Sequence, residues 1–169
     1  MELKSVISKI KSMPIDLRDL EPLLPDRCAI IQYKDLNKPR SVLFSKIDGY
    51  VVRIPNKTNK VGHFVVLLAK RNHIEFFSPT GGSIQSEFKR LGQDPSIINK
   101  LVGQDFIQNT KQLQSNKNNI QDCADWCLAR LYLKKLKLRE FQKLFNKSIH
   151  LQSSDDIVSL MCLLLLSTR

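Results

Sequence analysis

The sequence contains few residues of several kinds, and each shortage argues against a class of protein. It has only 12 aromatic residues (one Trp, three Tyr and eight Phe), without basic residues interleaved, so base stacking on single-stranded nucleic acid is not indicated. The three His are scattered, and no second close ligand pair accompanies Cys123 and Cys127, which disfavours a metal site. The apolar run from Ile157 to Leu166 is about half of the roughly 20 residues that cross a bilayer.

Acidic residues are scarce relative to basic ones. The 27 Lys and Arg outnumber the 16 Asp and Glu, giving a net charge of +11 and a pI near 9.7. This charge predicts attraction to a polyanion such as nucleic acid, an acidic peptide or a membrane surface. A solvated basic surface without a dedicated partner is the alternative. The candidates for contacting double-stranded DNA are Arg130, Lys134, Lys135, Lys137, Arg139, Lys143 and Lys147.

The N-terminal stretch lacks the apolar core of a signal peptide, and residues 1–13 have the pattern of a short amphipathic helix. The four cysteines are Cys28, Cys123, Cys127 and Cys162. We therefore expect free thiols in a reducing compartment and a protein that is not secreted.

The length of the chain and the order of its helix-like and strand-like segments predict one α+β domain over residues 1–169, with helices packed on a mixed β-sheet. The expected strands are Cys28–Tyr33, Val42–Ser45, Tyr50–Ile54, Gly62–Ala69, His73–Phe77 and Asp105–Gln108. The expected helices are Ile84–Leu91, Pro95–Val102, a region from Cys123 to Phe145 that breaks near Leu138, and a buried terminal helix opened by Ser153 and Ser154. The almost wholly apolar 62–69 stretch is typical of a central strand covered on both faces.

The stretch "QDCADWCLARLY" places Cys123 at the start of a predicted helix. The positive end of a helix dipole lowers the pKa of a thiol and favours the nucleophilic thiolate. A buried structural cysteine and a metal ligand paired with Cys127 are the alternatives. A nucleophilic Cys123 also requires a general base, which is normally a histidine.

Two further residues have the chemistry that such a thiol needs. His63 follows a glycine at the start of the most apolar strand, where a histidine has no packing role, although a strand-edge histidine is the simpler interpretation. Gln114 lies upstream of Cys123 in a polar loop and offers a side-chain amide that can bind an oxyanion. Gln112 and Gln121 lie in the same loop, so the amide signal is weak by itself.

The segments "GHFVVLL", "HIEFFSPTGG", "NTKQLQS" and "DCADWCLARL" follow one another in this order. Together they resemble the adenovirus-protease and SUMO-protease superfamily of cysteine peptidases, and most closely the maturation proteases of double-stranded DNA viruses, virophages and Polinton-like elements. The resemblance covers roughly residues 51–133. It implies a papain-like, adenovirus-protease-like fold in which Cys123 is the nucleophile, His63 its base and Gln114 the oxyanion-binding amide.

The sequence departs from the family pattern at three positions. Ser78 stands where Asp, Glu or Asn is expected as the third catalytic member, and a serine adds no charge that stabilises imidazolium. The centre would then work as a Cys-His dyad, recruit another group, or be impaired. Glu75 is three residues away, which places it on the opposite face of the strand. Phe64 replaces the usual tryptophan, and Ala124 replaces the usual glycine.

The resemblance implies a cysteine endopeptidase that cleaves capsid-protein precursors after small residues, at sites such as Gly-Gly or Gly-Ala. It implies no required cofactor, possible activation by DNA or a peptide, a monomer without a membrane partner, and a place in the virion and in the host-cell cytoplasm or virus factory. The alternatives are an impaired or non-enzymatic basic protein that binds or packages nucleic acid, and a deconjugating protease for a ubiquitin-like tag.

Overall fold

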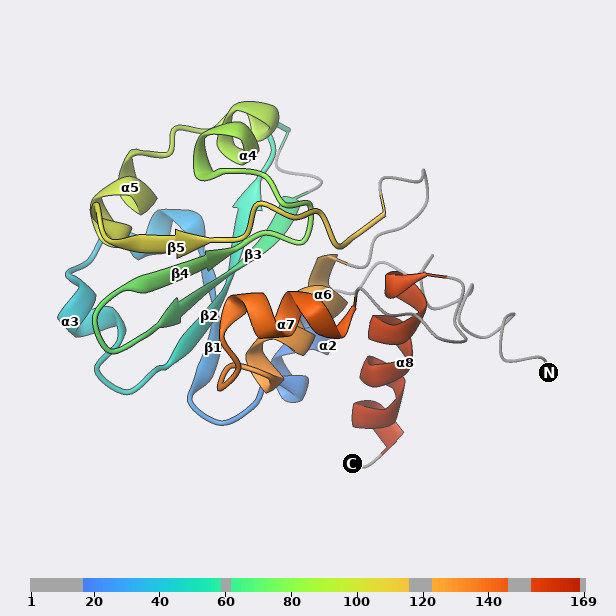
Figure 1. Ribbon diagram of the computed structural model, residues 1–169. Helices are drawn as coiled ribbons and strands as arrows, with labels where there is room; N and C mark the ends of the chain where they lie inside the picture. Colours follow the sequence, from blue (N-terminus) through green and yellow to red (C-terminus); the bar gives the residue numbers. More distant parts are fainter. Residues whose placement is uncertain (1–16, 59–61, 116–122, 146–152, 168–169) are drawn as a thin grey trace.

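The computed structural model describes residues 17–58, 62–115, 123–145 and 153–167 (Figure 1). Its centre is a five-stranded mixed sheet in the order β1-β2-β3-β4-β5. The strands are β1 (Cys28–Gln32), β2 (Gly49–Pro55), β3 (Gly62–Ala69), β4 (Ile74–Phe77) and β5 (Phe106–Gln108). β3 is antiparallel to β2 and β4, whereas β1 is parallel to β2 and β5 is parallel to β4. β3 therefore lies in the middle of the sheet.

Helices cover both faces of the sheet (Figure 1). α4 (Ile84–Leu91) and α5 (Ser96–Val102) lie on one face, and α6 (Cys123–Tyr132) and α7 (Leu138–Leu144) lie on the other. α8 (Ser154–Ser167) packs against α6. The remaining described helices are short and lie in the connections: α2 (Leu17–Leu20), η1 (Glu21–Leu23), η2 (Tyr33–Leu36) and α3 (Arg40–Leu43).

The side chains of β3 alternate between two apolar clusters. Val66 packs among residues of α6, α7 and α8, whereas Val65 packs among residues of α4 and α5. Both valines are fully buried, and burial of such a side chain contributes about 1.5–3 kcal/mol. The expected central strand at 62–69 and the α+β class are confirmed.

The bounds of α4 match the prediction because local signals define both ends. The Oγ of Ser83 accepts a hydrogen bond from the Ser86 N–H (3.2 Å), and Gly92 ends the helix in the left-handed conformation with φ of 68°.

The strand predicted at Val42–Ser45 is wrong. Residues 40–43 form α3 after Pro39, because burying Leu43 in a helical turn outweighs the strand preference of Val42, which is 58% exposed.

The other predicted strands and helices in the described residues agree with the structure apart from their ends. The terminal helix is only partly buried, since Val158 and Cys162 lie in the core while Leu164 is 59% exposed. The predicted helix at residues 1–13 lies outside the described residues. Among the described helices, none has both the length and the apolar character to cross a membrane.

Candidate active site

His63 is the second residue of β3 and is 6% exposed. Strand alternation gives it the face of Val65 and Leu67, which is the face covered by α4. Its Nε2 lies 3.2 Å from the Oγ of Ser78 and 3.6 Å from the Oε2 of Glu87. The ring is therefore held through Nε2.

Ser78 directly follows β4 and is fully buried. Asn109 fixes its backbone on both sides, since the Ser78 N–H donates to Asn109 Oδ1 (2.8 Å) and Asn109 Nδ2 donates to the Ser78 carbonyl (2.6 Å). The Ser78 hydroxyl donates to Glu87 Oε1 (2.8 Å). The structure thus brings Ser78 to His63, at the position that the resemblance assigns to the third member.

Glu87 is a site residue that the sequence analysis missed. It lies in the first turn of α4, is 2% exposed, and accepts hydrogen bonds from Ser78, Thr80 and Arg90. Its sequence signal is a carboxylate on the apolar face of an amphipathic helix, three residues after Ile84. A buried carboxylate at such a position requires polar partners, which the end of β4 provides.

The "SPTGG" turn makes room for this carboxylate. Gly81 has a φ of +72°, and a Cβ there would collide with the backbone of Lys111 and Gln112. A Cβ on Gly82 would collide with the carboxylate of Glu87. The two glycines therefore allow both the loop and α4 to approach the end of β4.

Gln114 is buried beside the same turn, because the backbone N–H groups of Leu113 and Gln114 both donate to the carbonyl of Pro79 (2.9 and 3.0 Å). The side chain of Gln112 donates to the Gln114 carbonyl instead (2.8 Å). Gln121 lies outside the described residues. The structure thus places Gln114 next to the segment that carries Ser78.

Cys123 is the first residue of α6 and is half-buried. α6 packs against the face of β3 that carries Val66 and Leu68, whereas His63, at the start of the strand, lies on the other face. Each of the three predicted site residues has a sequence neighbour in or against one apolar cluster. These neighbours are Phe64 beside His63, Leu113 beside Gln114 and Ala124 beside Cys123.

A buried carboxylate connects the Gln114 segment to α6. Asp155, in the first turn of α8, accepts hydrogen bonds from the Ser115 N–H (3.1 Å) and from Trp126 Nε1 (2.9 Å). Ser115 follows Gln114, and Trp126 lies three residues after Cys123. α8 therefore fixes the spacing of these two segments.

The other cysteines are less suited to nucleophilic chemistry. Burial raises the pKa of Cys28, although Lys134 opposes the rise, and burial raises the pKa of Cys127 well above its ordinary value. Cys162 is buried and donates to the Asp125 carbonyl (3.8 Å). All four are free thiols, and no group of three metal-ligating side chains occurs in the part of the chain that the structure describes.

The electrostatics favour a neutral His63 beside an ionised Glu87. Burial, opposed by the charge of Glu87 and assisted by that of Arg90, lowers the pKa of His63 from 6.5 to about 4. Burial alone would raise the pKa of Glu87, but the charge of His63 in its protonated form and hydrogen bonds from Thr80, Arg90 and Ser78 lower it overall. At neutral pH, His63 is therefore an uncharged imidazole that can accept a proton.

Glu75 does not take part in this network, as its position in the strand predicted. It is buried on the opposite face of the sheet, where both carboxylate oxygens accept hydrogen bonds from Arg130 (2.6 and 2.9 Å). Arg130 is fully buried, so its prediction as a nucleic-acid contact is wrong. Its charge has the structural role of tying α6 to β4 and to the carbonyls of Leu133 and Leu136.

The other predicted DNA contacts differ in exposure. Lys134 is mostly covered, with its Nζ bound to the Asp26 carbonyl and to Asp48. Lys147 lies outside the described residues. Four of the predicted contacts are exposed: Lys135, Lys137, Arg139 and Lys143.

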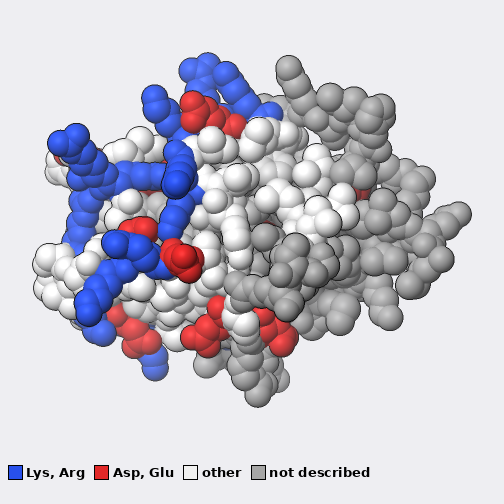
Figure 2. All heavy atoms as spheres, turned by 90° about the horizontal axis from the view of Figure 1, so that it is seen from below, with Lys and Arg blue, Asp and Glu red and all other residues white. Residues whose placement is uncertain are grey.

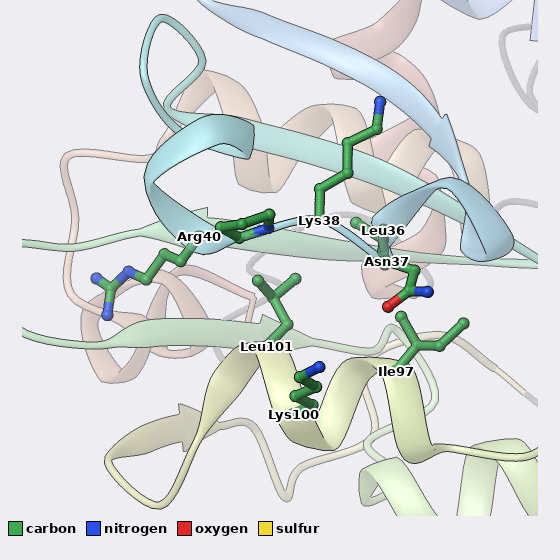
Figure 3. A pocket seen from close by; sticks show the side chains of 8 residues that line it. Leu36, Asn37, Lys38, Arg40, Ile97, Lys100 and Leu101 are labelled. Atoms are coloured by element: carbon green, nitrogen blue, oxygen red, sulfur yellow. The ribbon is translucent and has the colours of Figure 1, made fainter.

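A separate hollow of about 300 Å³ lies between η2, α3 and α5 (Figure 3). Leu36, Ile97 and Leu101 form its apolar wall. Arg40 on its rim donates to the carbonyls of Lys70 and His73, at the opposite end of β3 from His63. No predicted catalytic residue lines this hollow.

No protein-family model matches the chain. The chain is 25% identical over 161 residues to the "uncharacterized protein V9" of Sputnik virophage, and the match covers 84% of this chain and 90% of that protein. Among solved structures it is similar to the central domain of the uncharacterized protein Lpg1148 from Legionella pneumophila, with a TM-score of 0.50 and 16% identity over 91% of this chain and 98% of that one. This likeness concerns the fold.

The chain is also similar to the SUMO protease Ulp1, with a TM-score of 0.41 and 14% identity over 97% of this chain and 76% of that chain. A second structure shows the Ulp1 protease domain in complex with Smt3, the yeast ortholog of SUMO. Its TM-score is 0.37 and its identity 12%, over 96% of this chain and 75% of that chain.

Proposed function

We propose that the protein is a cysteine peptidase with Cys123 as nucleophile, His63 as general base and Gln114 as an oxyanion donor. The observation that carries the proposal is the state of His63, which is buried, neutral at physiological pH, and held by Ser78 and Glu87 through Nε2. Nδ1 is then the ring atom available to accept a thiol proton.

In the proposed reaction, Nδ1 of His63 takes the thiol proton of Cys123 while the sulfur attacks a peptide carbonyl carbon. The resulting oxyanion binds to the Cys123 N–H and the Gln114 amide. His63 then gives its proton to the amine, the C–N bond breaks, and a thioester remains. Water attacks the thioester, His63 accepts a proton from it, and the acid leaves as the thiol is restored.

The first experiment measures thiol reactivity and requires no substrate. Limiting iodoacetamide reacts with the native protein between about pH 5 and 9, and mass spectrometry maps alkylation at each cysteine. We expect Cys123 to react fastest and His63→Ala to abolish its advantage. Cys28, the other half-buried cysteine, is the internal control. Equal reactivity of the two thiols, or indifference to His63→Ala, would refute the proposal.

For the substrate, we propose capsid-protein precursors of a virus or virophage, cleaved after small residues, with the enzyme acting in the virion or the virus factory of the host cell. The virophage relative and the resemblance noted in the sequence support this assignment. Gly-Gly and Gly-Ala peptides provide the test, with a ubiquitin-like fusion protein as the comparison. Cleavage of only the fusion protein would favour deconjugation.

The second candidate function is binding of double-stranded DNA, favoured by two neighbouring surface hollows that share Asn56 and Lys57. Their basic lining residues are Lys34, Arg53, Lys57, Lys89 and Arg90, and neither has an acidic lining residue. On the face shown in Figure 2, by contrast, acidic side chains lie among the Lys and Arg. The two hollows therefore offer a more uniform positive surface for phosphates.

Duplex binding across a salt series tests this second function. Removing two phosphate contacts with the Lys57→Gln/Lys89→Gln double variant should reduce the slope of log K against log salt by about 2. Lys135→Gln/Lys143→Gln is the matched control, since both lysines are exposed elsewhere. A change confined to the control would assign DNA binding to the face near α7 instead.

A further inference from the structure

We propose that Glu87 is a positioning residue that supplies, through Ser78, the carboxylate that position 78 lacks. The inference rests on the proposed function for its catalytic consequence. Its structural basis is the contact series from His63 Nε2 to Ser78 Oγ (3.2 Å) and on to Glu87 Oε1 (2.8 Å).

The hydroxyl protons define the direction of this series. Glu87 is ionised and can only accept, so the hydroxyls of Ser78 and Thr80 supply protons toward its Oε1. Ser78 Oγ then presents a lone pair to His63. The imidazole is neutral, so its one N–H is at Nε2 and its free lone pair is at Nδ1. Glu87 thus selects the tautomer that a general base requires.

The carboxylate is fixed from several sides. Arg90 donates to its second oxygen, Oε2 (2.6 Å), and Thr80 donates to Oε1 beside Ser78. Gly82 leaves the space that the carboxylate occupies. A carboxylate with this many fixed partners does not need to reorganise when His63 gains a proton.

Two opposite charges act on His63 from α4. The Oε2 of Glu87 is 3.6 Å from Nε2 and stabilises the imidazolium, whereas Arg90 destabilises it. The residues touch each other, yet their removal should have opposite effects on His63. A purely structural role for the pair predicts effects of the same sign.

The test is NMR of the imidazole ¹⁵N and ¹³C nuclei of His63 in four proteins: wild type, Glu87→Gln, Ser78→Ala and Arg90→Gln. We expect the Nε2–H tautomer in the wild type at pH 7 and its loss as the dominant form in Ser78→Ala. The pKa of His63 should rise in Arg90→Gln, while in Glu87→Gln the ring should stay neutral to a lower pH than in the wild type. Shifts of the His63 pKa in the same direction in Glu87→Gln and Arg90→Gln, or an unchanged His63 tautomer in Ser78→Ala, would overturn the proposal.

Thiol kinetics measure the consequence for the site. Glu87→Gln should slow alkylation of Cys123 by roughly tenfold or more, and adding Ser78→Asp should restore part of the rate by placing a carboxylate beside the ring. If Glu87→Gln does not fold, Ser78→Ala and Arg90→Gln remain testable, since the native Arg90 side chain is 54% exposed. An unchanged His63 tautomer in Ser78→Ala, or a His63 pKa that does not rise in Arg90→Gln, would then overturn the proposal. An unreactive Cys123 in the wild type would refute the peptidase, whereas the His63 spectra would still decide the role of Glu87.

Discussion

Replacing Asp125 with Asn should stabilise the protein at neutral pH and lose this effect in acid. Asp125 is in the first turn of α6 and is 2% exposed, and its Oδ1 has no hydrogen-bond partner among the described residues. Burial raises the pKa of Asp125 from 3.8 to about 6, although Cys162 and Ser159 oppose the rise. Burial here outweighs the helix dipole, which favours a negative charge at this end.

The sign follows from proton binding. The folded state holds a proton on Asp125 more tightly than the unfolded state does, so the free energy of unfolding rises as the pH falls from about 6 to 3.8. The shift of about 2 units corresponds to about 3 kcal/mol, which destabilises the fold above pH 6. Asn carries no charge, so the advantage of Asp125→Asn over the wild type should shrink by most of that amount between pH 7 and pH 4.

Urea unfolding at several pH values measures this difference, with the fluorescence of Trp126 as the signal. Trp126 is the only tryptophan and is fully buried, so its emission should change on unfolding. Titrations elsewhere, including that of His63, occur in both proteins and cancel in the comparison. A stability difference that stays constant from pH 7 to pH 4 would show that Asp125 has an ordinary pKa.

Three further predictions use the same assay. The pKa of His63 is lowered from 6.5 to about 4, so the free energy of unfolding should fall by up to about 3 kcal/mol as the pH falls through this range. His63→Gln should remove that loss. The same loss of stability in acid in this variant would contradict the prediction. Glu75→Gln leaves the charge of Arg130 buried without its ion-pair partner and should lower the free energy of unfolding by about 3–5 kcal/mol. The double variant Glu75→Leu/Arg130→Met should recover much of that stability. A double variant no more stable than Glu75→Gln would contradict this prediction. Asp155→Asn should cost about 1–3 kcal/mol and alter the emission of Trp126 in the folded protein, because the indole N–H loses a charged acceptor; an unchanged spectrum and stability would show that this contact is dispensable.

Most of the fold could be predicted from the sequence because its signals are local. The apolar run at 62–69 predicts a central strand, and Ser83 and Gly92 mark the ends of α4. The helix at residues 40–43 was missed because a β-branched residue in a short segment favours a strand unless the burial of its neighbour is known. Burial also explains the error at Arg130, since counting charges does not show which of them meets Glu75 inside the fold.

The candidate site could be predicted only in part, for a geometrical reason. His63 lies at the start of β3, Ser78 directly follows β4 and Gln114 lies in a loop. Their order along the chain carries the family resemblance, and the structure brings Ser78 to His63. Glu87 reaches the site from a helix that packs on the sheet, and its placement depends on how α4 crosses the strands. Sequence spacing does not determine that crossing.

The serine at position 78 and the glycine at position 82 have to be considered together with Glu87. A serine places only a short hydroxyl beside His63, so a carboxylate must come from elsewhere if the imidazolium is to be stabilised by a negative charge. The carboxylate of Glu87 reaches the serine because residue 82 has no Cβ in its way. Gly82→Ala should therefore displace Glu87 from Ser78, change the tautomer of His63 as Ser78→Ala does, and slow Cys123 without altering Cys28. If Gly82→Ala instead left the His63 spectrum unchanged, the turn would tolerate the methyl group by moving away from α4, and the link between the glycine and the carboxylate would be incidental.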